Sequence, residues 1–292
     1  MGKLLRTIKN HGIGAVGMKL CGYGEDVFNR VFGTASYRIV NELPVFTPFS
    51  WGSWSDRARL TLLAANQTFP LLARLIAETR QPDLLNPAPI ESFCDDSASK
   101  NAASRLRELF NKYGSDKSHT HHYEYLYGSI LKNPAAVSSI LEIGLGTNNP
   151  DVVSHMGVAG RPGASLRAFR DFLPNATIYG ADLDTRILFQ EDRIKTFFVD
   201  QTDPASFEAL GKEIGEYLDL IIDDGLHSPN ANLAVLLFAL KKLKPGGRFV
   251  AEDIPDRALP VWQVVSALMP AEYKCSLASA GGANLFSVQK LQ

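Results

Sequence analysis

A series of apolar runs, each ended by an acidic residue or a glycine, occupies the stretch between Ile140 and Asp253. About four to six apolar or β-branched residues followed at once by Asp, Glu or Gly are typical of parallel strands that carry polar groups at their carboxyl ends. Open α/β sheets bind their ligands at that edge. The pattern therefore predicts a nucleotide-type binding sheet with an acidic second site. The runs are 140–146, 177–184, 196–203, 220–227 and 247–254.

The segments around these runs predict the remaining elements of one α/β domain. Two short strands at 273–278 and 284–289, separated by the Gly281-Gly282 turn, form a closing hairpin that adds an antiparallel strand. Alternation of strands and helices favours a doubly wound, mostly parallel sheet of seven strands. Helices are expected at Ala102–Lys112 and near 163–172, 204–217, 230–243 and 260–269.

The first hundred residues do not alternate in this way, and we expect a helical region and linker over 1–100 before a catalytic-type domain over 101–292. Residues 3–20 project as an amphipathic helix with Lys3, Arg6 and Lys9 on its polar side. Two interpretations stay open for it: packing on the protein's own core, or contact with a membrane surface. A second helix is expected up to Arg80, kinked or broken at Pro70.

Composition limits the classes of partner and compartment. The 30 Lys and Arg residues balance 31 Asp and Glu residues, so no net field favours nucleic acid as a partner. Three widely separated cysteines form neither a metal pair nor a disulfide framework, which fits a reducing cytoplasm. No stretch approaches the roughly 18 apolar residues needed to cross a bilayer. We therefore expect a cytoplasmic protein, associated with a membrane only if residues 3–20 bind one.

Three strand ends supply candidates for a nucleoside site. Glu142, Gly144 and Gly146 follow the first run, where glycine lets the backbone approach a ligand closely. A carboxylate before the first glycine would repel a pyrophosphate but would accept hydrogen bonds from an ammonium or a hydroxyl. Asp182 ends the second run, where an acid typically accepts the ribose hydroxyls. Asp200-Gln201 ends the third run and is placed to meet a base edge.

These three ordered sites, with Lys244–Asp253 behind them, resemble the class I S-adenosylmethionine-dependent methyltransferases. The resemblance implies that Glu142, Gly144 and Gly146 hold the methionine part of S-adenosylmethionine. It also implies that Asp182 holds the ribose and that Asp200 and Gln201 meet the adenine.

Further motifs resemble a narrower family, the metal-dependent sugar O-methyltransferases of the macrocin and mycinamicin type and the related cephalosporin-hydroxylase-like proteins. The resemblance implies a metal site at Asp223, with Asp224 as its neighbour, and at Glu252-Asp253. It places the histidine-rich segment and Tyr123 over the cofactor or substrate, and Ser165 beside the cofactor. The motifs are Ser115-Asp116-Lys117, His121-His122-Tyr123, the glycine turn before Ser165-Leu166, and Asp223-Asp224-Gly225-Leu226-His227.

Oxygen ligands of this kind suit Mg²⁺, which would lower the pKa of a sugar hydroxyl and orient it. His227 lies four residues after Asp223 and could remove the proton as a base. We therefore expect methyl transfer to a hydroxyl of a sugar or glycoconjugate by a homo-oligomeric enzyme. The alternatives are methylation of a non-sugar secondary metabolite, or a non-catalytic module of the same fold that binds a membrane or partner.

Overall fold

The computed structural model describes residues 35–49, 52–79 and 84–292 of the chain. By its internal contacts the chain divides into two compact units, Met1–Leu75 and Ile76–Gln292. The expected helix over residues 3–20 lies outside the described residues. The boundary placed at residue 100 stays a prediction, although Ala88–Pro89 already forms a strand of the second unit.

The described part of the N-terminal unit consists of α2 (Ala35–Glu42), a short 3₁₀ turn and most of α3 (Trp54–Thr79). The ring of Tyr37 packs on Trp54 with centroids 4.9 Å apart. The hydroxyls of Thr47 and Thr61 lie 3.0 Å from each other and join the turn to α3. The long helix expected here is confirmed as far as Thr79, but a break at Pro70 is wrong, because Pro70 lies inside one continuous helix.

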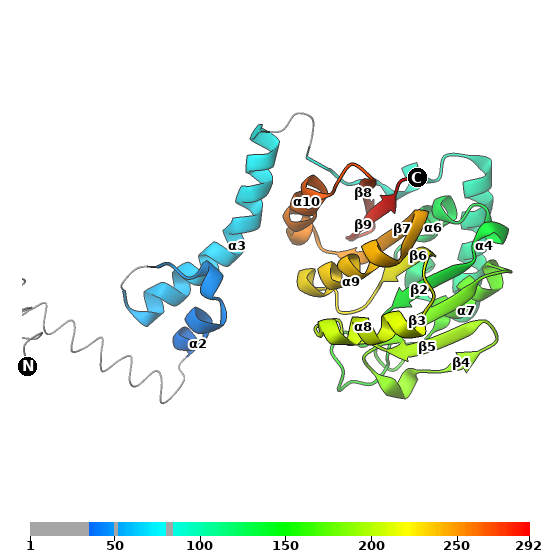
Figure 1. Cartoon of the computed structure of the whole chain (residues 1–292), viewed down its shortest axis with the longest axis horizontal. Coiled ribbons are helices and arrows are strands. Elements are labelled where there is room, and N and C mark those ends of the chain that lie inside the picture. Colours follow the sequence, from blue (N-terminus) through cyan, green and yellow to red (C-terminus); the bar gives the residue numbers. More distant parts are fainter. Residues whose placement is uncertain (1–34, 50–51, 80–83) are drawn as a thin grey trace, which may run out of the picture. The chain divides into compact units, whose positions relative to one another are not determined.

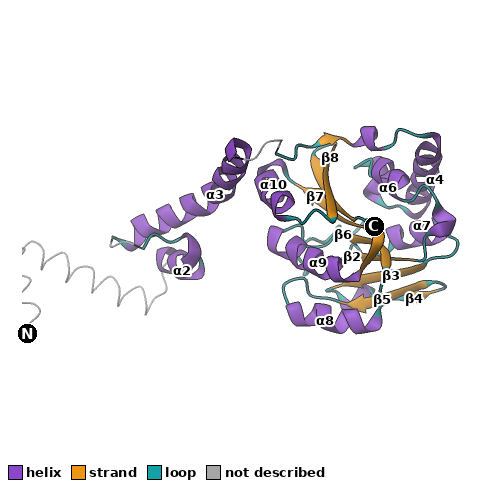
Figure 2. Cartoon of the chain, turned by 45° about the horizontal axis from the view of Figure 1, so that its top comes forward, coloured by secondary structure: helices purple, strands orange, loops and turns teal. Residues whose placement is uncertain are grey.

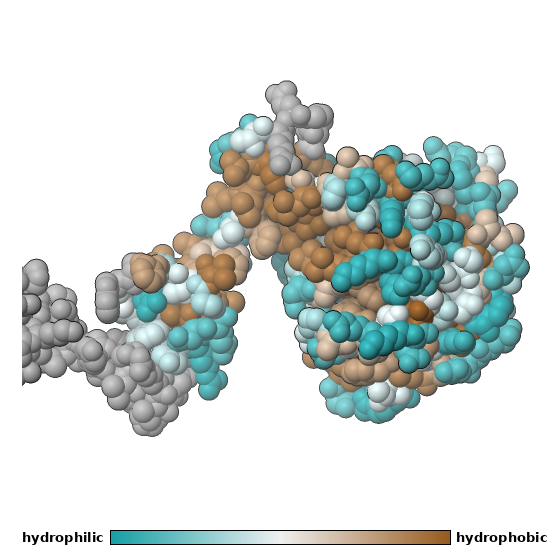
Figure 3. Space-filling view, in the orientation of Figure 1, coloured by the Kyte–Doolittle hydropathy of each residue, from teal (hydrophilic) through white to brown (hydrophobic). Residues whose placement is uncertain are grey.

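Helix α3 is long and apolar enough to cross a membrane, by length and composition alone, and little of it is buried. This differs from the expectation that no stretch comes near that limit. The reason is that Asn66, Gln67 and Thr68 interrupt the apolar residues without adding charge. Figure 3 shows hydrophobic residues on the surface of α3. Leu60, Leu63 and Leu71 of this helix are exposed.

The second unit is built on one sheet in the order β1-β8-β9-β7-β6-β2-β3-β5-β4 (Figure 1). Its central strands β7, β6, β2, β3 and β5 are parallel, whereas β9 runs antiparallel to both β7 and β8. The strands are β1 (Ala88–Pro89), β2 (Ser139–Ile143), β3 (Thr177–Asp182), β4 (Gln190–Glu191), β5 (Ile194–Phe198), β6 (Leu218–Asp223), β7 (Leu243–Ile254), β8 (Tyr273–Ala280) and β9 (Ala283–Lys290).

The doubly wound α/β class is confirmed, together with the closing hairpin. The sheet has nine strands in the described residues rather than the seven expected. Both extra strands, β1 and β4, have two residues, too few to produce a recognisable alternation in the sequence.

Helices cover both faces of this sheet (Figure 2). Because side chains alternate along a strand, Ile140 and Ile222 join the core under α4, α6 and α7, whereas Leu141 and Ile221 join the core under α8, α9 and α10. The parallel strands are therefore apolar on both faces, as their continuous apolar runs predicted. The helices are α4 (Ser97–Tyr113), α5 (Asp116–His119), α6 (Glu124–Ile130), α7 (Ala164–Phe172), α8 (Pro204–Glu213), α9 (Pro229–Lys242) and α10 (Leu259–Leu268).

Register brings the acidic turns to one edge of the sheet. Ile143 of β2 pairs with Asp223 of β6, which in turn pairs with Ala251 of β7. The residues that follow these three positions, Gly144, Asp224 and Glu252, therefore lie side by side; β2 and β6 end there, whereas β7 continues to Ile254. The backbone N–H of Asp224 donates to the carbonyl of Ile143 at 2.8 Å, which ties the two loops together.

Candidate cofactor pocket and acidic centre

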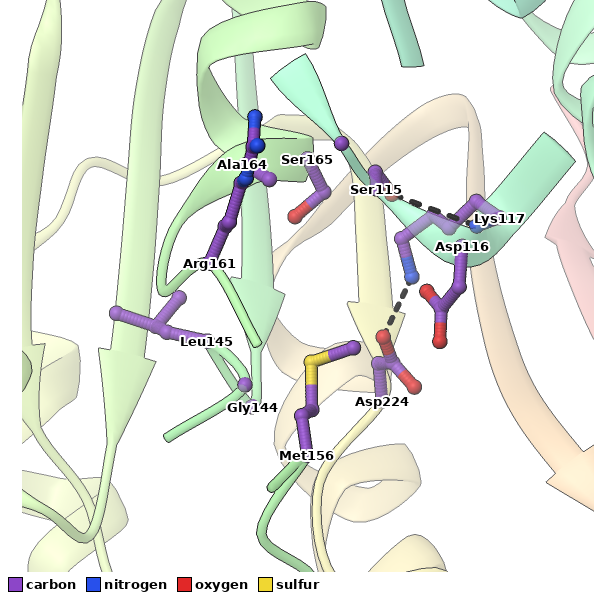
Figure 4. A pocket seen from close by; sticks show the side chains of 12 residues that line it. Ser115, Asp116, Lys117, Gly144, Leu145, Met156, Arg161, Ala164, Ser165 and Asp224 are labelled. Atoms are coloured by element: carbon purple, nitrogen blue, oxygen red, sulfur yellow. Dashed lines mark hydrogen bonds and ion pairs between the residues drawn. The ribbon is translucent and has the colours of Figure 1, made fainter. Parts of the chain in front are cut away.

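A pocket opens between the loop after β2 and the turn that precedes α5 (Figure 4). Gly144 and Gly146 have φ values of 91° and 75°, in the left-handed region that favours glycine. A Cβ on Gly144 would lie 2.0 Å from the carbonyl oxygen of Asp224, so only glycine fits between the two loops. The pocket is lined by Gly114, Ser115, Asp116, Lys117, Gly144, Leu145, Gly146, Met156, Arg161, Ala164, Ser165 and Asp224.

Glu142 lies beneath this pocket and does not line it. Its side chain has no exposed surface, and Oε2 accepts a hydrogen bond of 2.7 Å from the hydroxyl of Ser165. Burial raises the pKa of Glu142, and the nearby Lys117 ammonium opposes that rise. The ammonium group that Glu142 contacts in this structure is therefore the protein's own Lys117, at 3.1 Å from Oε1.

Asp182 lies at the end of β3, where the sequence placed it, and it holds the glycine loop in place. Its Oδ2 accepts from the N–H of Leu145 at 2.7 Å and its Oδ1 from the N–H of Asp184 at 2.8 Å. Burial raises the pKa of Asp182, and these two amides counteract the rise. Asp184 is also buried and accepts from the Thr147 hydroxyl and the Asn149 amide.

The side chains of the third predicted site, Asp200-Gln201, make hydrogen bonds to other groups of the protein. Asp200 accepts from the N–H and hydroxyl of Thr202, which closes the turn after β5. The amide of Gln201 is used by the protein: Nε2 donates to Asp223 at 2.8 Å and Oε1 accepts from the N–H of Leu226 at 2.8 Å. Gln201 therefore joins the β6 strand end to the loop that follows it.

Asp223 is fully buried at the end of β6, and both of its oxygens accept amide hydrogen bonds. Gln201 donates to Oδ1, and Asn232 of α9 donates to Oδ2 at 2.7 Å. Burial raises the pKa of Asp223 to about 6, against the effect of these two donors. The structure thus separates Asp223 from the acids around Lys117 and from those around His227. Its neighbour Asp224 belongs to both groups.

Lys117 lies at the middle of three carboxylates that come from three strand ends. Its Nζ lies 2.6 Å from Oδ2 of Asp224, 2.5 Å from Oε2 of Glu252 and 3.1 Å from Oε1 of Glu142. Burial alone would lower the pKa of Lys117, but Asp224, Glu252 and Glu142 raise it well above its ordinary value. The ammonium is therefore a permanent buried cation.

Glu252 is held entirely by groups from residues 117–127. Lys117 binds one of its oxygens, and the Tyr127 hydroxyl donates to the other. Burial raises the pKa of Glu252 and the Asp224 carboxylate raises it further, whereas the Lys117 ammonium opposes the rise. Glu252 lies within the Lys117 cluster, where its carboxylate neutralises the ammonium.

Asp224, His227 and Asp253 form a second, more accessible cluster, whose potential ligand atoms lie within 4.8 Å of one another. Nε2 of His227 lies 3.9 Å from Oδ1 of Asp224 and 3.7 Å from Oδ2 of Asp253. His227 and Asp253 have φ values of 52° and 56°, an uncommon conformation for non-glycine residues that concentrates at functional sites. Two carboxylate oxygens beside an imidazole suit a divalent cation.

Tyr123 supports this second cluster rather than lining the pocket. It is buried, and its hydroxyl donates to Oδ1 of Asp253. Of the predicted histidine-rich flap, His121 reaches the same carboxylate, with Nδ1 3.8 Å from Oδ1 of Asp253 and its ring stacked on Tyr123.

The structure therefore brings Gly144, Gly146 and Ser165 together around the pocket. It brings His227 and Asp253 together with Asp224 in the second cluster. Tyr127 and the role of Lys117 were not predicted from the sequence. A lysine followed six and ten residues later by tyrosines was the available signal. That spacing does not reveal that Lys117 and Tyr127 both reach Glu252 and that Tyr123 reaches the adjacent Asp253.

The arrangement of the sheet, glycine loop and strand-end acids is that of the class I S-adenosylmethionine-dependent methyltransferase fold. The MycE methyltransferase from the mycinamycin biosynthetic pathway, solved in complex with Mg and SAH, superposes with a TM-score of 0.52 at 23% identity, over 64% of this chain and 55% of that chain. At this identity the likeness concerns the fold. No family model matches the chain.

Two curated relatives confirm the narrower resemblance. The chain is 31% identical over 160 residues to 8-demethyl-8-alpha-L-rhamnosyl tetracenomycin-C 2'-O-methyltransferase of Streptomyces olivaceus, which covers 54% of this chain and 40% of that protein. It is 33% identical over 150 residues to demethylmacrocin O-methyltransferase of Streptomyces fradiae, covering 51% of this chain and 34% of that protein. The chain thus matches less than half the length of these relatives.

Proposed function

We propose that this protein transfers a methyl group from S-adenosylmethionine to a hydroxyl of a sugar in a glycosylated natural product, with the help of Mg²⁺. The observation that carries the proposal is the position of Asp224. It lines the pocket of the glycine loop and also belongs to the cluster with His227 and Asp253. A cofactor-type pocket and a cation-type cluster therefore share one wall, as transfer of a methyl group to an activated hydroxyl requires.

The curated relatives support the sugar acceptor. Their names include a rhamnosyl tetracenomycin 2'-O-methyltransferase and a mycinamicin VI 2''-O-methyltransferase, the latter 37% identical over 93 residues. MycE was also solved with Mg, SAH and mycinamycin VI together.

Each residue has a definite task in this proposal. Gly144, Gly146 and Ser165 receive the methionine part of the cofactor, and Asp182 holds the loop at its ribose side. Asp224 and Asp253 hold the cation, which when bound lowers the pKa of the acceptor hydroxyl. His227, whose Nε2 faces both carboxylates, accepts the hydroxyl proton.

Glu252 and Asp223 have other tasks here than the direct metal contact first expected of them. Glu252 neutralises Lys117, and Asp223 fixes Gln201 and the loop that carries Asp224. A non-sugar acceptor and a non-catalytic module remain the competing hypotheses. Homo-oligomerisation, a cytoplasmic location and membrane contact through residues 3–20 stay predictions.

Calorimetry on the full chain tests the proposal without knowledge of the acceptor. S-adenosylhomocysteine should bind in the presence of EDTA, and Mn²⁺, used as a probe of the Mg²⁺ site, should bind to the chelator-free protein. Asp224→Asn should weaken Mn²⁺ binding at least about tenfold, whereas Asp192→Asn, a change at a carboxylate with 91% exposure, should not weaken it. Failure of the wild-type protein to bind S-adenosylhomocysteine would refute the proposal.

A further inference from the structure

Two cationic side chains line the cofactor pocket, and they differ in what they bind. Lys117 is buried and contacts three carboxylates of the protein itself. Arg161 is exposed at the same pocket, in the loop that leads to α7. Within the described residues its guanidinium takes part in no hydrogen bond or ion pair with the protein.

Arg161 lies at the pocket, close to the C-terminal end of α4 (Figure 4). Gly114 ends α4 in the left-handed conformation, with φ of 77°. A Cβ at this position would lie 2.9 Å from Cδ and 3.1 Å from Nη1 of Arg161. The side chain of Arg161 therefore occupies the space that the absence of a Cβ leaves free.

Two other side-chain donors of the pocket are already engaged. The Ser165 hydroxyl donates to Glu142, and the Lys117 ammonium is surrounded by Glu142, Asp224 and Glu252. The pocket also presents the acids Asp116 and Asp224. A ligand carboxylate in this pocket would meet repulsion from these acids and would find one uncommitted cation.

We propose that Arg161 binds the carboxylate of the methionine part of S-adenosylmethionine and so fixes that end of the cofactor. This inference rests on the proposed function, which supplies a ligand with a carboxylate. A guanidinium can bind a carboxylate through two parallel hydrogen bonds, which fix direction as well as position. A lysine at the same place would supply the charge without that geometry.

A pair of ligands isolates this contact. S-adenosylhomocysteine carries the carboxylate. Its decarboxylated analogue, in which a 3-aminopropyl group replaces the 3-amino-3-carboxypropyl group, does not. Arg161→Met should weaken binding of S-adenosylhomocysteine about 10- to 100-fold, the range of a charge-assisted contact, and weaken the analogue less than about threefold. Arg161→Lys should lie between, and Arg105→Met, at an exposed arginine of α4, should change neither affinity.

A variant of Gly114, the residue against which Arg161 lies, tests the same contact. Gly114→Ala should displace Arg161 and weaken S-adenosylhomocysteine more than the analogue. Equal losses for both ligands in Arg161→Met, or no loss at all, would overturn the role of Arg161 while leaving the proposed function intact. A wild-type protein that binds neither ligand would overturn the proposed function, and this inference with it.

Discussion

Lys117 and Glu252 form an ion pair that is almost completely withdrawn from solvent. Nζ lies 2.5 Å from Oε2, and the two side chains are 2% and 1% exposed. The pair joins the α5 turn to the carboxyl end of β7, 135 residues further along the chain. Because Lys117 also binds Oδ2 of Asp224, the other oxygen of Asp224 is left to face His227. The buried cation thereby divides the acids into an internal cluster and an accessible one.

The first prediction concerns this buried cation. Lys117→Met should lower the free energy of unfolding by about 3–5 kcal/mol, because Glu142 and Glu252 lose their counterion inside the protein. Urea denaturation measures the change. The double variant Lys117→Met with Glu252→Gln should recover part of the loss. Lys112→Met, which removes an exposed ammonium paired with Asp171, should lower stability by no more than about 1 kcal/mol. Equal stability of Lys117→Met and wild type would refute the assignment.

The second prediction decides between two adjacent acids. Asp224→Asn should weaken Mn²⁺ binding at least about tenfold, since it removes a carboxylate oxygen from the accessible cluster. Asp223→Asn should retain Mn²⁺ affinity within about threefold, because Gln201 and Asn232 occupy that side chain. Titration of Mn²⁺ followed by electron paramagnetic resonance measures both. The reverse order of effects would restore Asp223 as the ligand.

The third prediction distinguishes whether His227 acts as a general base or as a metal ligand. Asparagine tolerates the left-handed backbone there and offers no imidazole. We therefore expect His227→Asn to lower kcat about 10²- to 10⁴-fold, the usual range for a general base, with Mn²⁺ affinity nearly unchanged. His155→Asn, at an exposed histidine of the loop after β2, is the matched control. A loss of Mn²⁺ affinity parallel to the loss of kcat would make His227 a ligand.

The fourth prediction follows from the buried carboxyl of Asp223. Its pKa is raised from 3.8 to about 6, so the folded state binds a proton that the unfolded state releases between these values. The stabilising contribution of Asp223 is thus complete below pH 3.8 and is lost as pH rises to about 6. Relative to Asp223→Asn, the wild-type unfolding free energy should fall by about 3 kcal/mol across this window. A constant difference between the two proteins would contradict the raised pKa.

The sequence predicted the strand ends well because each parallel strand here is an uninterrupted apolar run with an acid or glycine after it. That pattern located Asp182, Gly144 and Asp253 at one edge of the sheet. It could not say which of Asp223 and Asp224 faces the site. That choice depends on the last strand residue being buried under α9 and the next one turning outward, a matter of about one residue in register.

Long-range pairing accounts for what the sequence left out. Lys117, Tyr123 and Tyr127 belong to a segment that precedes the sheet, and they reach acids more than one hundred residues away. Gln201 was expected to meet a base edge, yet its amide joins Asp223 to the next loop. Local spacing indicates which face of an element a residue occupies but does not identify a partner from another strand.

Transfer of a labelled methyl group tests the proposed reaction most directly. The full chain would be incubated with S-adenosylmethionine carrying a trideuterated methyl group and a panel of glycosylated polyketides with free sugar hydroxyls, in Mg²⁺ or in EDTA, and the products read by mass spectrometry. We predict a labelled methyl ether on a sugar that forms in Mg²⁺, disappears in EDTA and returns when Mg²⁺ is restored. Equal product in EDTA and in Mg²⁺ would contradict the role given to Asp224 and Asp253.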